Sequence, residues 1–279
     1  MNKKKGLKIS ILIDNYIEIP GLKAEHGLSI LIEEGDHKIL FDCGQSDQII
    51  NNAKKLDLEL GDINQIVLSH GHYDHTGGLS AILDLCKGID VYGHPGIFDK
   101  KYSMKKQQRY IGIQEEREFY ENKGANFKLS SESSKLAINI YTTGQIPRVT
   151  SFEKTDDSFI KIDNNEYIKD DILDDLSLII ERDEGIILLL GCAHSGIINT
   201  LKQAVEMTGR DNFLLIIGGM HLAGKNKHYV KKILEEINRY KIRNLAPIHC
   251  SGAANLPSFE KYFGKKVIYG GAGKVFRYY

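Results

Sequence analysis

Short apolar or alternating runs separated by glycine-containing turns open the chain and predict β-strands. The first three runs lie at Lys8–Ile13, Leu28–Glu33 and Lys38–Phe41. A segment with apolar residues at helical spacing follows them at Gln45–Leu56. The next apolar run, Ile63–Leu68, predicts a buried strand that ends directly before a loop rich in glycine and histidine.

A charged segment interrupts the alternation after a predicted helix at Leu79–Leu85 and a predicted strand at Asp90–Tyr92. Within Lys100–Lys123, lysine and arginine residues are followed by a run of glutamates. We therefore predict a partly helical charged insertion at about residues 95–130. A solvated surface is the simpler interpretation, and a lid or an oligomer contact is the alternative.

Strands and helices alternate again in the second half of the chain. Strands are predicted at Leu136–Tyr141, Leu176–Glu181, Ile186–Leu190, Phe213–Ile217, Asn244–Ile248 and Lys266–Ile268, and helices at Ile197–Met207 and His228–Tyr240. The acidic segment Thr150–Asp175 is expected to be irregular. Each half begins with strands and ends in β-α alternation, which predicts an α/β fold, a four-layer αβ/βα sandwich. Because no Pro/Gly linker separates the halves, residues 1–279 are predicted to form a single domain.

Composition excludes several classes of protein. Hydrophobic residues make up 42% and charged residues 27% of the 279 positions, as in ordinary globular chains. Lys+Arg and Asp+Glu both number 37, so no global positive field favours a nucleic acid as partner. No apolar stretch approaches the roughly 20 residues of a membrane span, and the basic start Met1–Lys5 leads into a strand rather than a signal peptide.

The four cysteines favour an intracellular protein. Cys43, Cys86, Cys192 and Cys250 lie far apart and form no C-x-x-C pair. A disulfide framework is not expected in a chain of this length, so a reducing cytoplasm is the predicted compartment. The expected partner is a small molecule rather than a nucleic acid or a membrane, and a homo-oligomer is left open.

The most informative stretch lies directly after the strand Ile63–Leu68. His70, His72, Asp74 and His75 offer imidazole nitrogens and a carboxylate, the ligands that suit Zn²⁺, Mn²⁺ or Fe²⁺. Side chains alternate along an extended segment, so His70 and His72 can face one metal ion together. After the chain turns, Asp74 and His75 can face a second ion. Buried histidines need partners, which makes a metal-free polar loop the weaker interpretation.

His70-x-His72-x-Asp74-His75 followed by Thr76-Gly77-Gly78 resembles the signature of the metallo-β-lactamase superfamily. Phe41-Asp42-Cys43-Gly44 resembles the strand end that precedes this signature in the family. The resemblance implies the four-layer fold and two divalent metal ions, zinc in first place with manganese or iron as alternatives. The signature is specific for the fold and only weakly specific for the reaction.

Three further histidines follow strands in the second half, where open sheets collect their ligand groups. His249 resembles the family's last metal-ligand histidine, His194 is a further predicted ligand, and His221 is a ligand or a substrate-facing acid. Two positions depart from the family pattern. Cys192 stands where the bridging aspartate is expected, and Gln145 stands where a histidine is expected. The second metal site is therefore predicted to be the weaker one.

Ala24-Glu25-His26-Gly27, Thr143-Gly144-Gln145-Ile146-Pro147-Arg148 and Gly191-Cys192-Ala193-His194 together resemble a narrower branch of that superfamily. This is the dihydropteroate-synthase-like branch, related to β-ribofuranosylaminobenzene 5′-phosphate (dihydropterin) synthase. The resemblance implies a phosphorylated or pterin-like substrate. His26, Arg148 and Cys192 are the predicted substrate-binding residues, and Arg148 offers a fork that suits phosphate or carboxylate.

The predicted function is a metal-dependent hydrolase that activates water for attack on an ester, phosphoester, thioester or lactone. Asp74 would hold the water or a metal ion and accept a proton, and His221 would protonate the leaving group. A transferase or synthase acting on a pterin or ribosyl-phosphate compound is the first alternative. A diiron redox enzyme is disfavoured by His72, a nuclease by the charge balance, and a non-catalytic binder on a degraded metal site remains.

Overall fold

The computed structural model of the chain describes residues 6–86 and 88–279, so the basic start Met1–Lys5 and Lys87 lie outside the described residues. Internal contacts divide the chain into two compact units, and each is described by itself. The first unit comprises Met1–Lys101, Tyr110–Leu129 and Gly270–Tyr279, and the second comprises Tyr102–Arg109 and Ser130–Tyr269. Across the described part of the chain, no helix combines the length and apolar character needed to cross a membrane.

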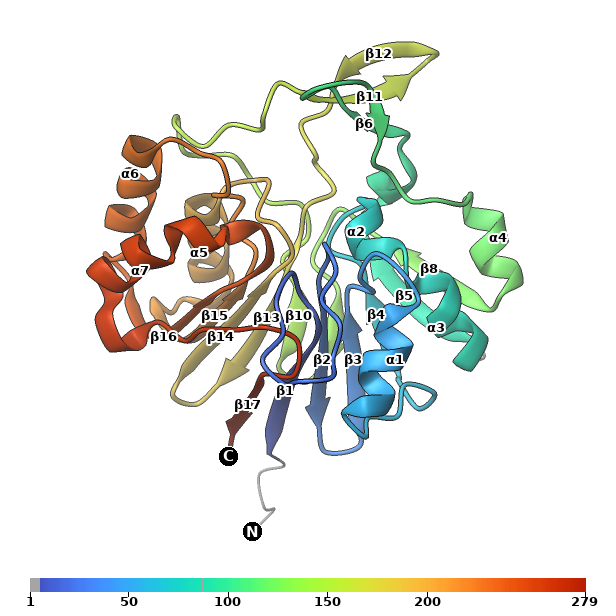
Figure 1. Cartoon of the computed structure of the whole chain (residues 1–279), viewed down its shortest axis with the longest axis horizontal. Coiled ribbons are helices and arrows are strands. Elements are labelled where there is room, and N and C mark those ends of the chain that lie inside the picture. The colour runs from blue at the N-terminus through green and yellow to red at the C-terminus, as the bar shows by residue number, and fades with distance from the viewer. Residues whose placement is uncertain (1–5, 87) are drawn as a thin grey trace. The chain divides into compact units, whose positions relative to one another are not determined.

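The first unit is built on a mixed sheet with the strand order β17-β1-β2-β3-β4-β5-β8 (Figure 1). Its strands are β1 (Leu7–Ile13), β2 (Ser29–Glu34), β3 (His37–Phe41), β4 (Gln65–Val67), β5 (Ile89–Gly93), β8 (Ala125–Leu129) and β17 (Val275–Tyr278). The strands from β17 to β3 pair antiparallel, whereas β3, β4, β5 and β8 pair parallel. The parallel part brings the carboxyl ends of β3 and β4 to the same edge.

Helices cover one face of this sheet because their apolar residues recur every three or four positions. Helix α1 (Gln48–Lys55) buries Ile49 and Ala53, and α3 (Leu79–Leu85) buries its apolar side in the same core as Leu40 of β3. The remaining helical elements of the first unit are α2 (Tyr73–Thr76), α4 (Arg117–Asn122) and the 3₁₀ turn η1 (Pro95–Phe98).

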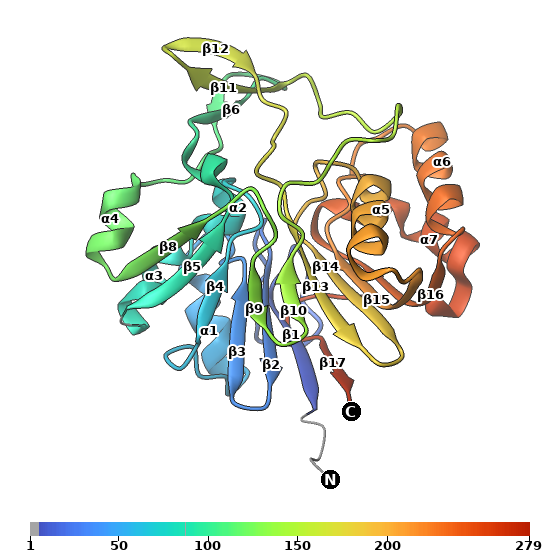
Figure 2. The same cartoon turned by 180° about the vertical axis from the view of Figure 1, so that it is seen from behind.

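The second unit has a sheet with the order β16-β15-β14-β13-β10-β9 (Figure 2). Its strands are β9 (Lys135–Ala137), β10 (Ile140–Thr142), β13 (Ser177–Arg182), β14 (Gly185–Leu190), β15 (Asn212–Gly218) and β16 (Lys241–Pro247). Strands β14, β15 and β16 run parallel, so the loops that follow them emerge at one edge.

Three helices pack on one face of the second sheet and form a core with it. They are α5 (Ile197–Thr208), α6 (Lys227–Ile237) and α7 (Leu256–Phe263). Leu188 and Ile216 of the sheet lie in this core with Leu201, Ile233 and Phe259 of the three helices. The helices therefore hold the parallel strands, and with them the three strand-end loops, in place.

A small sheet in the order β12-β11-β6-β7 lies where the chain passes between the units. Its strands are β6 (Lys101–Ser103), β7 (Arg109–Tyr110), β11 (Phe159–Asp163) and β12 (Glu166–Lys169). The prediction that Thr150–Asp175 is irregular is therefore wrong in part, because β11 and β12 form a hairpin there. The sequence of this hairpin shows little alternation of apolar and polar residues, and β12 is exposed along its whole length. The predicted insertion at about residues 95–130 contains η1, β6, β7, α4 and β8. That residues 1–279 form a single domain stays a prediction.

Other differences concern the ends of elements. A turn divides the predicted strand Leu136–Tyr141 into β9 and β10. The predicted last strand Lys266–Ile268 is wrong: a 3₁₀ turn, η4 (Gly264–Lys266), precedes a single bridge at Val267, and the last strand is β17. Short runs without clear alternation are ambiguous in sequence, and here partner strands decide their conformation. Two further 3₁₀ turns, η2 (His249–Ser251) and η3 (Ala253–Asn255), follow β16.

Leu188 gives a test of the second core, because its side chain is fully buried in β14 against the helices. We expect Leu188→Ala to lower the free energy of unfolding by about 2–5 kcal/mol, through lost burial and the cavity it leaves. Chemical denaturation measures this change. Ile138→Ala, at a position with 85% of its surface exposed, is the matched control and should change stability by less than about 0.5 kcal/mol. An equal effect of both variants would contradict the assigned core.

Candidate metal centre

The histidine-rich loop of the first unit gathers its donor atoms tightly. His72 is extended and immediately precedes α2, so the chain turns between His72 and Asp74. His70 Nε2 lies 2.9 Å from His72 Nδ1, and the rings of His70 and His75 lie 4.2 Å apart. All four predicted ligands of this loop are buried. The structure therefore brings together the side chains that the sequence singles out.

Asp42, which follows β3, orients two of these histidines. Its Oδ2 lies 2.7 Å from His75 Nδ1, and its Oδ1 accepts a 2.7 Å hydrogen bond from the backbone N–H of Ser69. Ser69 Oγ donates to Asp42 and lies 2.9 Å from His70 Nδ1. The Nδ1 side of both rings is thus held by Asp42 and Ser69, and the Nε2 atoms lie toward His72 and Asp74. This carboxylate–histidine arrangement is typical of metal sites.

Asp74 is buried beside two histidines of the first unit. Its Oδ2 lies 3.7 Å from His75 Nε2 and 3.2 Å from His26 Nε2. The side chain of His26 is 52% exposed, so its ring borders the buried carboxylate from the solvent side. This position suits the predicted role of His26 at the substrate side of the loop.

Close backbone packing fixes the loop on both sides. A Cβ on Gly77 or Gly78 would collide with the carbonyl oxygen of Gln45 or Cys43, respectively, so both positions require glycine. On the other side, Tyr73 N donates to Ile111 O at 2.9 Å. Ile111 belongs to the predicted charged insertion, which therefore supports the loop directly.

The second unit places three histidines at the ends of its parallel strands. Ala193, His221 and His249 all have positive φ, at 52°, 49° and 51°. Left-handed backbone is unfavourable for residues with a Cβ, and such strain clusters at functional sites. The rings of His194 and His221 lie 4.4 Å apart, and each lies against Phe159. His249 is buried at the start of η2.

Asp175 supports the loop that carries Cys192 and His194. Its Oδ2 accepts a 2.9 Å hydrogen bond from Ser195 N, and the side chain is fully buried. Burial raises the pKa of Asp175 to about 6, although hydrogen bonds from Ser195 and His194 and the charge of Arg148 act in the opposite direction. The carboxyl group is therefore a buried support whose charge changes near neutral pH.

Cys192 and Cys250 form a buried thiol pair in the same unit. Their sulfur atoms lie 3.3 Å apart, and neither cysteine forms a disulfide. Burial alone would raise the pKa of Cys250, but the hydrogen bond with Cys192 and the neighbouring His249 and His221 outweigh it and lower the pKa well below its usual value. The Cys250 thiol is therefore more acidic than an ordinary buried thiol.

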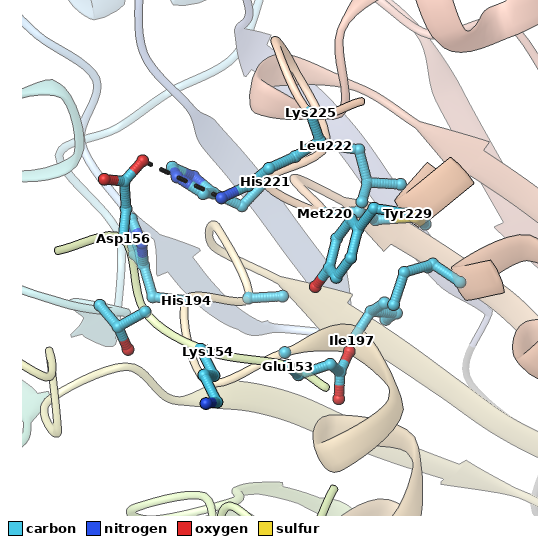
Figure 3. A pocket seen from close by; sticks show the side chains of 14 residues that line it. Glu153, Lys154, Asp156, His194, Ile197, Met220, His221, Leu222, Lys225 and Tyr229 are labelled. Carbon is cyan, nitrogen blue, oxygen red and sulfur yellow. Dashed lines mark ion pairs between the residues drawn. The ribbon is translucent and has the colours of Figure 1, made fainter. Parts of the chain in front are cut away.

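A small cavity of the second unit adjoins His194 and His221 (Figure 3). Asp156 at its rim lies 3.6 Å from Lys105 Nζ and 4.0 Å from Lys225 Nζ, the latter pair being dashed in Figure 3. Burial would raise the pKa of Asp156, but hydrogen bonds from Ser158 and the two lysines lower it to about 2. Two cations thus flank one carboxylate at the edge of this cavity.

Arg148 and Glu153 make contacts within the second unit. The Arg148 guanidinium donates to the carbonyl oxygens of Asp171 and Ile172 and to Thr155 Oγ1. The Glu153 carboxylate accepts hydrogen bonds from the first-turn N–H groups of α5, where negative charge is favourable. The structure thus ties Arg148 to the chain segment around 171–172.

Sequence reasoning missed several residues that shape the two donor clusters. Asp42 belongs to a quoted motif without an assigned role, and nothing in the local sequence marks Asp175 or the pairing of Cys250 with Cys192. For Asp42, its position after a strand parallel to β4 was the available signal. For the others, the contact joins positions far apart in the chain.

The donor set of the first unit fits a divalent metal ion. His70 Nε2 lies 2.9 Å from His72 Nδ1 and Asp74 Oδ2 lies 3.7 Å from His75 Nε2, and Asp42 and Ser69 hold the His70 and His75 rings from behind. Such nitrogen and oxygen donors suit Zn²⁺, Mn²⁺ or Fe²⁺. The second unit adds histidines and thiols at its strand ends.

The chain is similar to proteins of one superfamily. The model of the family described as "Metallo-beta-lactamase superfamily" matches residues 22–189. Uncharacterized protein MJ0448 of Methanocaldococcus jannaschii is 35% identical over 96% of this chain and 98% of its own length. The 7,8-dihydropterin-6-methyl-4-(beta-D-ribofuranosyl)-aminobenzene-5'-phosphate synthase of the same organism is 27% identical over 100% of this chain and 99% of its own.

A solved structure is similar along almost the whole chain. The crystal structure of Tm1679, described as a metal-dependent hydrolase of the beta-lactamase superfamily, has a TM-score of 0.84 and 28% sequence identity. The alignment covers 97% of this chain and 98% of that one.

Asp42→Asn tests the orientation of the first-unit histidines. The amide keeps the shape and tolerates the positive φ of 61° but cannot supply the carboxylate that holds His75 Nδ1–H. We expect metal affinity to fall by about 10- to 100-fold. Competition with a chromophoric chelator measures it, and Asp47→Asn on the exposed start of α1 is the control. Unchanged affinity in Asp42→Asn would refute the orienting role.

Asp175→Asn tests the buried carboxyl group through pH. The pKa of about 6 lies above the unfolded value of about 3.9, so the folded state binds this proton more tightly. That contribution is fully present below about pH 4 and is lost as pH rises through about 6. At pH 7 the variant should therefore exceed the wild type in unfolding free energy by about 2–3 kcal/mol, and at pH 4 the two should agree.

Denaturant titrations at both pH values measure the difference. Glu166→Gln on the exposed strand β12 should follow the wild type at each pH. A constant offset between Asp175→Asn and wild type from pH 4 to pH 7 would contradict the raised pKa.

Proposed function

The chain belongs to the metallo-β-lactamase superfamily and has its mixed α/β fold with two sheets, as predicted, and from this premise we propose that it is a metal-dependent synthase or transferase acting on a pterin or ribosyl-phosphate compound. The observation that carries the proposal is the full-length likeness to the dihydropterin-aminobenzene-phosphate synthase. A likeness over the whole of both chains extends well beyond the shared metal-binding signature.

The proposed metal ligands are His70, His72, Asp74 and His75 in the first unit, with His194 and His249 from the strand ends of the second. A divalent ion bound there, zinc in first place, would act as a Lewis acid toward a substrate oxygen. Asp42 and Ser69 would keep the imidazole rings in their binding orientation. Asp74 is placed to accept a proton, with the His26 ring 3.2 Å from its carboxylate.

The charges near His221 support a phosphorylated substrate. Lys105 and Lys225 flank Asp156 at the cavity beside His194 and His221, which leaves a net positive edge. Lysine is a common point-charge ligand of phosphate groups. Arg148 is the weaker candidate for this task because its guanidinium donates to backbone carbonyls. His221 at the cavity is the proposed acid for a leaving group.

Hydrolysis of a phosphoester, thioester or lactone is the second candidate function. It is favoured by the likeness to Tm1679, described as a metal-dependent hydrolase. The same ligands would serve both reactions. The two differ in whether water or a second substrate attacks, so a direct comparison of products separates them.

The experiment is a product assay with the zinc-loaded protein. A 7,8-dihydropterin that carries a leaving group on its 6-methyl carbon is incubated with 4-(β-D-ribofuranosyl)-aminobenzene 5′-phosphate. Mass spectrometry follows the joined product, in which the two substrates are linked and the leaving group has been released. A parallel panel contains phosphoesters, thioesters and lactones. We expect metal-dependent formation of the joined product. Turnover of the hydrolytic panel without any joined product would reject the synthase and retain the hydrolase.

Two variants connect the reaction to the proposed site. His70→Ala should abolish turnover and lower the metal content measured by elemental analysis. Lys225→Gln should raise KM for the phosphorylated substrate and leave kcat within about twofold, since its charge acts on binding. Lys231→Gln, on the exposed side of α6, is the matched control. Full turnover in the metal-free protein would overturn a metal-dependent reaction of either kind.

A further inference from the structure

Three potential soft-metal ligands meet at the parallel edge of the second sheet. Cys192 follows β14, His221 follows β15 and Cys250 follows β16. Because these strands are parallel neighbours, the residues that follow them meet at one edge of the sheet. One ligand atom from each of the three residues lies within 4.8 Å of the other two.

The sulfur of Cys250 sits in a polar cradle. It accepts a hydrogen bond from the backbone N–H of His221 at 3.3 Å and lies 3.3 Å from the sulfur of Cys192. A Cβ on Gly219 would lie 2.6 Å from this sulfur, so only glycine allows the backbone to approach it so closely. A backbone N–H directed at sulfur favours the thiolate over the thiol.

His221 provides the third donor. Its Nδ1 is buried and has no hydrogen-bond partner in the structure, although an imidazole nitrogen removed from water normally finds one. The backbone of His221 is held in the left-handed region at φ 49°, and Met220 N bonds to Ser251 Oγ on the neighbouring loop. This backbone conformation and the hydrogen bond to Ser251 hold the loop that carries the imidazole ring near the two sulfur atoms.

We infer that Cys192, Cys250 and His221 form a thiolate-rich site for a soft divalent cation, with Zn²⁺ as its natural occupant. Two thiols lose their protons to solvent on binding, so two thiolates balance the charge of the dication. Two sulfurs and one nitrogen make three protein ligands, which leaves the fourth tetrahedral position open. The site goes beyond the proposed function, and an ion bound there would make His221 a ligand in place of the acid for a leaving group.

Two apolar buried thiols are the simpler interpretation of the cysteine pair. That interpretation explains the burial of both side chains. It does not explain a backbone N–H directed at one sulfur, or an imidazole nitrogen buried beside both without a partner. A bound cation would be a partner for both sulfur atoms and for the imidazole nitrogen at once.

Cobalt(II) reports the site directly, because only a thiolate ligand gives an intense charge-transfer absorption in the near ultraviolet. The metal-free, fully reduced protein is titrated with Co²⁺ and the absorption is followed, with proton release measured in a weakly buffered solution. We expect the absorption to develop with release of up to two protons per bound ion, one for each thiol that is still protonated. Mn²⁺ should not displace Co²⁺ at equal concentration, whereas Zn²⁺ should.

Matched variants locate the ligands. Cys250→Ser and Cys192→Ser should each weaken the absorbing site at least about tenfold, and His221→Ala should shift the visible cobalt bands. Cys86→Ser is the control: that thiol is buried and bonded to Leu60 O, and serine keeps the hydrogen bond. Circular dichroism spectra verify that each variant is folded.

The outcomes separate this site from the proposed function. Absorption that persists in His70→Ala and disappears in Cys250→Ser supports a distinct thiolate site. Absence of the charge-transfer band in the wild type, or its presence unchanged in both cysteine variants, overturns the inference. In either of those cases the histidine-rich loop of the first unit can still bind metal and support turnover, so the proposed function is judged by its own assay.

Discussion

Parallel strand pairing is the constraint on which both donor clusters depend. The first cluster is the loop from His70 to His75, and the second comprises Cys192, His221 and Cys250. In a parallel ladder every carboxyl end lies at the same edge, so residues separated by tens of positions in sequence become neighbours. Asp42 after β3 meets the loop after β4 in this way, and Cys192 and Cys250 meet across β15. The helices that fill the cores of the two units stabilise these ladders.

Carboxylates from distant segments then fix the loops that the ladders bring together. Asp42 accepts the N–H of Ser69, Asp175 that of Ser195, and Glu25 those of Gln45 and Ser46. A buried carboxylate is costly unless it is hydrogen-bonded, so Asp42 and Asp175 offset part of their own desolvation by bonding these loops. Raised pKa at Asp175 shows that its backbone bonds only partly offset this desolvation.

The sequence predicted the parts of the site that are local in the chain. His70 to His75 could be recognised because ligands at this spacing have few other uses, and the strand before them was a clear apolar run. The strands β14 and β15 could be recognised because each is also a clear apolar run. Cys250 as a neighbour of Cys192, and Asp175 as a support, depend on which strands pair and in what register. That information is distributed over the whole sheet and appears in no single segment.

The two donor clusters differ in chemical softness, and this difference has consequences for the ions that each would bind. The first unit offers imidazoles and a carboxylate, which accept several divalent ions, whereas the thiols of the second unit prefer zinc or similar ions. A cysteine at the position of an expected bridging aspartate replaces a hard charge shared between ions by a soft charge directed to one. An ion held by Cys192 and Cys250 would therefore be more firmly tied to the second unit. Its open position would serve a substrate atom there, beside Lys225 and the cavity at His194.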